Sequence, residues 1–233
     1  ILISVMFANN EIGTIEPIKD IGAIAKKHNI LFHTDAVQAY AHIPIDVEEM
    51  NIDLLSASGH KFHSPKGCGF LYIKNGIKLK AFIQGGAQER KRRAGTENLP
   101  AIVGMVAALK DDLENQAQNF EKVQQLKAIF LKEMAETDYY LNQGKDQLPY
   151  VLNIGFPGQR NDLLLLRLDL EGISISTGSA CTAGVVQVSH VLQAFYGEDS
   201  PRLHESVRVS ISPQNTEQEM ITLANTLKNI IGG

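Results

Sequence analysis

The chain has 233 residues, of which 44% are hydrophobic and 21% are charged, and its formal net charge is −4. This composition is typical of a soluble globular protein that is long enough to bury a core without disulfides or structural metals. The slight acidity gives no overall attraction for nucleic acid or for an anionic membrane, so neither is expected as a partner. The run Glu89–Arg93 is the one local basic patch, and an isolated charge run of this kind is most often a solvated surface.

The two cysteines, Cys68 and Cys181, are far apart and belong to no Cys-x-x-Cys or Cys/His cluster. The spacing therefore indicates neither a metal site nor a disulfide framework, and a reducing cytoplasm is the expected location. The most apolar stretch, residues 163–170, is interrupted by Arg167 and Asp169 and is too short to span a membrane. The chain begins in a strand-like run without Met or a basic leader, which suggests the C-terminal portion of a longer protein.

Short apolar runs alternate with helical patterns in the first half of the chain. Pro17 is expected in the first turn of a helix over residues 18–27, because proline is tolerated there. Strands separated by helices favour a mostly parallel sheet with right-handed crossovers and with helices on both faces, which is an α/β architecture. The predicted strands cover residues 1–8, 30–34, 52–57 and 69–73.

Apolar residues then recur every three or four positions from Ile102 to Met134, which predicts one long amphipathic helix. Such a stripe usually packs against a core and less often forms a groove for a partner. A helix of this length commonly bridges two domains. The helix is therefore expected to separate residues 1–116 from a smaller C-terminal α+β domain over residues 117–233.

The second half carries strand and helix signals of its own. Asn161 is a plausible N-cap for a helix over residues 162–171, and Gly172 is a plausible stop. Thr216 and Glu219 form a capping-box pattern that opens a last helix toward Ile231. Strands are predicted over residues 150–156, 173–176 and 207–211.

Polar residues follow the predicted parallel strands, at the edge of the sheet where such folds bind ligands. Taken alone, Asp35 would most often be a helix N-cap and Lys61 a solvated surface lysine. Taken together, they supply the minimum that pyridoxal phosphate needs: a lysine for covalent attachment, and an acid that keeps the ring nitrogen protonated. The polar residues at these strand ends include Asn9, Asn10, Glu11, Asp35, Gln38, Ser58, His60 and Lys61.

Seven spaced motifs, in order along essentially the whole chain, resemble those of the cysteine desulfurases. These are pyridoxal-phosphate enzymes of aminotransferase class V with the type I fold. Any one motif would be weak evidence, whereas seven in order are specific. The motifs are Asn9–Gly13, His33–Gln38, Ser58–Gly67, Gly85–Arg90, Arg93–Asn98, Gly178–Cys181 and Glu205–Arg208.

The resemblance makes residues 1–116 part of a large pyridoxal-phosphate-binding domain and residues 117–233 the small C-terminal domain. It also implies a role for each matching residue. Thr96 would reach the phosphate of a neighbouring subunit's cofactor, which implies a homodimer, and Glu89–Arg93 would be an interface loop. Lys61 would attach the cofactor covalently, and Asp35 would pair with its ring nitrogen. Asn10 and Gln38 would contact the ring and its 3-hydroxyl. Ser58 and His60 would be further cofactor ligands, and His60 would also lie near the proton-transfer site.

Cys181 and Arg208 are the residues that would act on the substrate. A lone cysteine is usually a small buried hydrophobe, but residues 177–184 form a small, polar, glycine-bearing segment that would expose a thiol. The resemblance makes Cys181 the nucleophile, whereas Cys68 is assigned a structural role. An arginine can bind a substrate carboxylate through two hydrogen bonds, and the resemblance gives that role to Arg208, assisted by Asn153.

The implied reaction converts L-cysteine to L-alanine and leaves a persulfide on Cys181. That sulfur would pass to an acceptor such as an iron–sulfur cluster scaffold or a tRNA-thiolation carrier. The sequence departs from the family at Ser64, at Ala87 and over residues 211–214, and the family's phosphate-cradling N-terminal part has no counterpart before Ile1. Open alternatives are a selenocysteine lyase or an aminotransferase of the same fold, or an inactive fragment that retains only dimer or partner contacts. Cys181 argues against an aminotransferase, because transamination needs no thiol.

Overall fold

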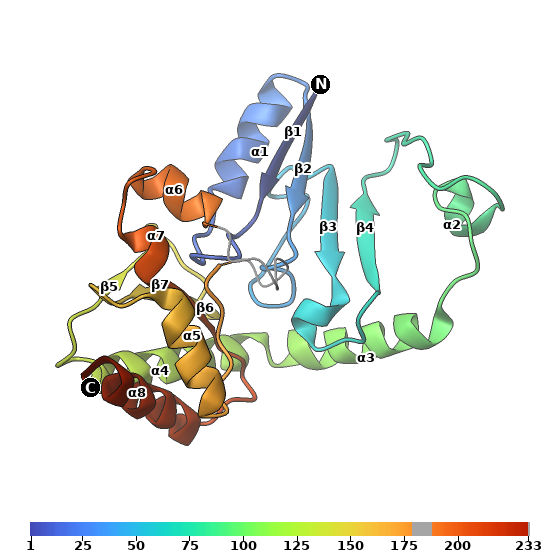
Figure 1. The fold of residues 1–233 in the computed structure, drawn as a ribbon. Helices are drawn as coiled ribbons and strands as arrows, with labels where there is room; N and C mark the ends of the chain where they lie inside the picture. The colour runs from blue at the N-terminus through green and yellow to red at the C-terminus, as the bar shows by residue number, and fades with distance from the viewer. Residues whose placement is uncertain (179–187, 233) are drawn as a thin grey trace. The chain divides into compact units, whose positions relative to one another are not determined.

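The computed structural model describes residues 1–178 and 188–232. The chain divides into two compact units (Figure 1). One consists of Ile1–Phe7 and Glu16–Gln116, and the other of Ala8–Ile15 and Ala117–Gly233. The short segment Ala8–Ile15 therefore belongs to the second unit, although it lies between two pieces of the first unit in the sequence.

The first unit is built on a four-stranded sheet in the order β1-β2-β3-β4. Strands β1, β2 and β3 are parallel, whereas β4 is antiparallel to β3. The prediction of a mostly parallel α/β sheet is confirmed. The strands are β1 (Leu2–Met6), β2 (Leu31–Asp35), β3 (Leu54–Ser58) and β4 (Gly69–Ile73).

Helix α1 (Ile18–Lys27) begins after Pro17, as predicted, and connects β1 to β2. It buries Ile18 and Ala25 next to the β2 residue Phe32, which is fully buried. At Gly22 the helix approaches the neighbouring chain so closely that an added Cβ would lie 1.9 Å from the carbonyl oxygen of Met50. Only glycine permits this packing.

The prediction that helices connect the parallel strands and cover both faces of this sheet is met only in part. Within the described residues of the first unit, α1 is the one helix that connects two parallel strands. The chain between β2 and β3 forms turns without a helix, and the connection from β3 to β4 is the short 3₁₀ helix η1 (Gly59–Phe62). Leu2, Leu31 and Leu71 are consequently 51%, 38% and 48% exposed.

The single long helix predicted from Ile102 to Met134 is wrong. Two helices, α3 (Leu99–Glu114) and α4 (Gln116–Glu133), are separated at Asn115. The carboxamide of Asn115 donates to the carbonyl oxygen of Asp111, the kind of local hydrogen bond with which asparagine competes against a continuing helix. The apolar stripe is also buried unevenly, since Phe130 in α4 is fully buried whereas Leu113 in α3 is 50% exposed.

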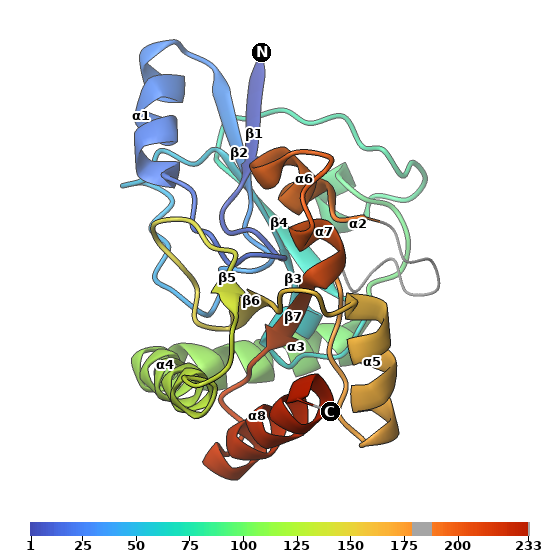
Figure 2. The same cartoon turned by 60° about the vertical axis from the view of Figure 1, so that its left-hand side comes forward.

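The second unit contains a three-stranded antiparallel sheet in the order β5-β6-β7. Figure 2 shows two of its helices, α5 and α8, alongside each other. The strands are β5 (Tyr140–Leu141), β6 (Val151–Gly155) and β7 (Ser206–Ser210), and the helices besides α4 are α5 (Asn161–Leu170), α6 (His190–Tyr196), α7 (Arg202–Glu205) and α8 (Glu217–Gly232). No helix in the described parts of the chain is both long and apolar enough to cross a membrane.

Three local predictions in this unit have different outcomes. The capping box is confirmed, because the hydroxyl of Thr216 accepts from the Glu219 N–H and the Glu219 carboxylate accepts from the Thr216 N–H. Asn161 is not the N-cap of α5; Arg160 takes that position, and the Asn161 carboxamide instead donates to the carbonyl oxygens of Leu203 and Ser206. The strand predicted over residues 173–176 is wrong, since its pairing is limited to one bridge from Ser176 to β7.

Candidate active site

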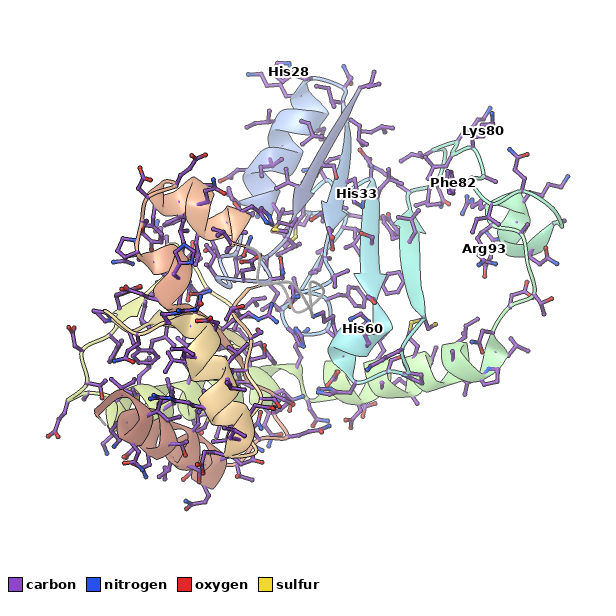
Figure 3. All side chains as sticks on the ribbon, in the orientation of Figure 1. His28, His33, His60, Lys80, Phe82 and Arg93 are labelled. Carbon is purple, nitrogen blue, oxygen red and sulfur yellow. The ribbon has the colours of Figure 1, made fainter. Side chains whose placement is uncertain are left out.

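Five of the predicted cofactor residues gather at one edge of the sheet in the first unit. Asp35 ends β2 and Ser58 ends β3, and these parallel strands present their carboxyl ends at the same edge. Gln38 follows in the turn after β2, and His60 and Lys61 lie in η1 directly after β3. Figure 3 shows His60 at this end of β3.

The turn that carries Lys61 is tightly built. The Ser58 hydroxyl lies 2.8 Å from His60 Nδ1, which fixes the imidazole ring beside the strand end. At Gly59 an added Cβ would lie 2.6 Å from the Ser64 hydroxyl and 3.1 Å from the carbonyl oxygen of Cys68. Glycine is therefore required before the histidine and the lysine. His60 is exposed and Lys61 is half-buried.

The carboxylate of Asp35 is held by its own turn. Its Oδ1 accepts a hydrogen bond of 2.9 Å from the Val37 N–H, while Oδ2 makes no hydrogen bond within the described residues. A half-buried carboxylate with one anchored oxygen and one available oxygen fits the task of holding a protonated ring nitrogen. The same edge also carries the Lys61 amine, the Ser58 hydroxyl, the His60 imidazole and the Gln38 carboxamide. Together with the Asp35 carboxylate, this set of groups fits pyridoxal phosphate.

A polar link across the parallel strands was missed by the sequence reasoning. The Ser4 hydroxyl lies 2.7 Å from His33 Nδ1, and the Ser56 hydroxyl lies 3.2 Å from His33 Nε2. The link joins β1, β2 and β3 on the face that also carries Asp35, because His33 and Asp35 are two positions apart in one strand. The sequence signal that could have revealed this link is the strand periodicity of β2, which places His33 and Asp35 on the same face.

A histidine and carboxylate cluster lies near the lysine-bearing turn and was also missed. His63 Nδ1 is 3.4 Å from the buried carboxylate of Asp112, and His42 Nδ1 is 2.9 Å from the carbonyl oxygen of Gln38. Burial lowers the pKa of His42, although the hydrogen bond to Gln38 and the charge of Asp112 act in the opposite direction. Asp112 lies on α3, far along the sequence from both histidines, so no local pattern indicated this cluster.

The predicted substrate residues gather in the second unit. Arg208, in β7, is buried and its Nη1 donates to the carbonyl oxygen of Asn10 at 2.9 Å. Asn153, in the neighbouring strand β6, donates from Nδ2 to the carbonyl oxygen of Glu11 at 3.1 Å. Asn10, Asn153 and Arg208 are thus brought together, although 198 positions separate the first from the last.

Two predicted residues remain, Thr96 and Cys181. Thr96 is exposed in the first unit, in the connection between β4 and α3 where Figure 3 labels Phe82 and Arg93. Cys181 falls in residues 179–187, outside the described residues. Just beyond that segment, the hydroxyl of Ser189 donates to the buried carboxylate of Glu11.

The sequence profile of the class-V aminotransferases matches residues 1–223, so the chain belongs to the class-V aminotransferase family, as its motifs predict. It is similar to the "Putative cysteine desulfurase IscS 1" of Bacillus subtilis (strain 168), with 48% identity over 234 residues that make up 99% of this chain and 62% of that protein. The solved "NifS-like protein" aligns with a TM-score of 0.89 and 34% identity over 99% of this chain and 61% of its own. "SspA in complex with cysteine" aligns with a TM-score of 0.76 and 38% identity over 92% of this chain and 60% of its own.

These comparisons confirm the predicted family and the type I fold. They also show that the chain spans only 60% to 62% of the length of these three relatives.

Proposed function

We propose that the complete protein is a pyridoxal-phosphate-dependent cysteine desulfurase. It converts L-cysteine to L-alanine and carries the sulfur as a persulfide on Cys181. The observation that carries the proposal is the gathering of Lys61 and Asp35 at one edge of the parallel sheet. Support comes from the desulfurase name of the Bacillus subtilis relative and from the relative solved with cysteine.

The first unit provides the cofactor residues. Pyridoxal phosphate, when bound, supplies an electron sink that stabilises negative charge on the substrate carbon. The Lys61 amine would provide the attachment point, and the Asp35 carboxylate would hold the proton on the ring nitrogen. Gln38 and Ser58 orient the cofactor. Because His60 Nδ1 is engaged by the Ser58 hydroxyl, Nε2 is the His60 atom that accepts and returns a proton.

The second unit provides the substrate residues. Arg208 binds the substrate carboxylate, assisted by Asn153, and Asn10 contacts the cofactor ring. The Cys181 thiolate attacks the substrate sulfur, so that a sulfur–sulfur bond forms while the carbon–sulfur bond breaks. The carbon keeps the electron pair of the broken bond and takes up a proton, which yields alanine.

Three further parts of the proposal concern the assembly. The enzyme is a homodimer in which Thr96 of one subunit contacts the cofactor phosphate of the other. It works in the cytoplasm. The sulfur passes from Cys181 to an acceptor protein, such as an iron–sulfur scaffold or a tRNA-thiolation carrier.

Mass spectrometry tests the central step. The complete protein, loaded with pyridoxal phosphate and exposed to L-cysteine, is expected to gain a reductant-sensitive sulfur on Cys181 and none on Cys68, with alanine as the other product. A keto acid formed without sulfur on Cys181 would instead support an aminotransferase.

Borohydride reduction tests the attachment site. The Lys61→Ala variant is expected to lose the cofactor adduct that borohydride fixes, because alanine has no amine. Lys66→Ala, at an exposed lysine of the same loop, is the matched control and should keep the adduct. A fixed adduct in the Lys61→Ala variant would reject the assignment.

A further inference from the structure

A buried chain of hydrogen bonds runs through the second unit from Arg202 to the main chain of Glu11. Arg202 Nη1 donates to Asn142 Oδ1 at 2.9 Å, and Asn142 Nδ2 donates to Asn153 Oδ1 at 2.8 Å. Asn153 Nδ2 then donates to the Glu11 carbonyl oxygen at 3.1 Å. Asn142 and Asn153 are only 1% and 2% exposed, so water cannot readily replace either partner.

The direction of this chain is fixed by its two ends. The guanidinium of Arg202 can only donate, and the carbonyl of Glu11 can only accept. The two carboxamides between them therefore fit in one orientation, since turning either one over would set two donors or two acceptors against each other. The main chains of the two residues are also joined, because the Asn142 N–H donates to the Asn153 carbonyl oxygen at 3.0 Å.

Aromatic rings hold the donor end. The guanidinium carbon of Arg202 lies 4.0 Å from the ring centroid of Tyr140 and 4.5 Å from that of Tyr196. Cation–π contacts of this kind restrict the position of the guanidinium. The Tyr140 hydroxyl in turn donates to Glu205 at 3.0 Å, and burial raises the pKa of Tyr140 to about 12, which keeps that hydroxyl protonated.

The acceptor end lies next to the predicted substrate arginine. Glu11 follows Asn10, whose carbonyl oxygen accepts from Arg208. The side chain of Asn9 accepts from the N–H groups of Glu11 and Ile12 at 2.8 and 3.0 Å, so these residues form one rigid turn. A displacement of the Glu11 carbonyl therefore moves the group that orients Arg208.

We propose that Asn142 and Arg202 are positioning residues of the substrate-carboxylate site. The polarised chain Arg202–Asn142–Asn153–Glu11, here called the amide relay, fixes the turn that orients Arg208 and holds the Asn153 carboxamide in one orientation. The inference rests on the proposed function, in which Arg208 binds the carboxylate of the substrate.

The variant Asn142→Asp tests the relay with almost no change in side-chain shape. Its carboxylate still accepts from Arg202 but cannot donate to Asn153, so two oxygens face each other where a hydrogen bond was. In the complete holoenzyme, the KM for L-cysteine and the Kd for L-alanine are expected to rise about tenfold, which is the loss of roughly one buried hydrogen bond, with a smaller change in kcat.

Ser206→Ala is the matched control. The Ser206 hydroxyl is the second acceptor of Asn142 Nδ2, at 2.8 Å, so its removal costs a comparable local hydrogen bond and leaves the relay intact. Both variants are expected to lower the midpoint of thermal unfolding, whereas only Asn142→Asp should weaken L-alanine binding. In an Arg208→Lys background the effect of Asn142→Asp should shrink, because the relay acts through Arg208.

An Asn142→Asp variant with unchanged KM and Kd would overturn the relay, as would an equal rise in the Ser206→Ala variant. A parent protein that binds L-alanine but releases no sulfur from cysteine would overturn the proposed function alone, and the L-alanine affinities would still decide the relay. A parent protein that binds neither amino acid would overturn both.

Discussion

Arg208 donates from Nη1 to the carbonyl oxygen of Asn10, which fixes the orientation of its guanidinium. Arg208→Lys keeps the positive charge but loses the planar pair of donors, so we expect kcat/KM for L-cysteine to fall roughly tenfold to a hundredfold, or about 1.5–3 kcal/mol. Steady-state kinetics measures the loss. Arg167→Lys, at an exposed arginine that donates to the carbonyl oxygen of Ile230, should change little. An unchanged kcat/KM would mean that another residue binds the carboxylate.

The Asp35→Asn variant removes the negative charge of Asp35 but keeps the side-chain hydrogen bond that holds its turn. The Asn Oδ1 can still accept from the Val37 N–H, so the fold and the attachment at Lys61 should survive. A neutral carboxamide holds the ring proton poorly, and we expect kcat to fall on the order of a hundredfold or more. Asp53→Asn is the control, because Asp53 binds the Phe32 N–H and Lys74 in the same sheet and should affect stability more than rate. A near-normal kcat for Asp35→Asn would remove Asp35 from the site.

Cys181→Ser should abolish sulfur release while leaving cofactor absorbance unchanged, because serine is a far weaker nucleophile and cannot carry a persulfide. Alanine and sulfide production are the measurements. Cys68→Ser should behave like the parent, since Cys68 packs near Met105 and is assigned no chemistry. Sulfide release by Cys181→Ser at the parent rate would exclude the proposed mechanism.

His42 should make the fold less stable in mild acid. Burial lowers the pKa of its imidazole below the ordinary 6.5, so protonation is harder in the folded than in the unfolded chain. The contribution to stability is therefore complete above about pH 6.5 and is lost as the pH falls toward the lowered pKa of the folded state. Midpoints of urea unfolding between pH 8 and pH 5 measure it. His42→Gln should flatten the dependence, whereas His28→Gln, at an exposed histidine, should not.

Thr216→Ala should cost about 1 kcal/mol of unfolding free energy, the usual contribution of an N-terminal cap. The change removes the hydroxyl that accepts from the Glu219 N–H at 3.2 Å. Urea titration measures the loss. The exposed mid-helix Thr222→Ala is the control and should be neutral or slightly stabilising, because alanine favours helix. Equal effects of the two changes would contradict a capping role.

Local patterns predicted what is decided locally. The strand over residues 69–73 and the capping box of Thr216 both depend on neighbouring residues, and both predictions agree with the structure. The strand predicted over residues 173–176 failed because alternation cannot say whether a partner strand is present. The break at Asn115 was hidden by an apolar stripe that continues through it.

The candidate site shows the same division. The motifs predicted that Lys61 and Asp35 follow neighbouring parallel strands, because consecutive parallel strands share one carboxyl edge. The amide relay could not be predicted, since Asn142 and Arg202 are 60 positions apart and neither belongs to a recognisable pattern. Buried carboxamides acquire a role only from the groups that pack around them.

The assignment of Ala8–Ile15 to the second unit sets an order of events during synthesis. The turn that orients Arg208 leaves the ribosome long before its partner, because 198 positions separate Asn10 from Arg208. At about 5–20 residues per second, the wait is about 10–40 s. Throughout that time Asn9–Gly13 has none of the partners that β7 provides, so the second unit cannot reach its final packing before β7 has been translated.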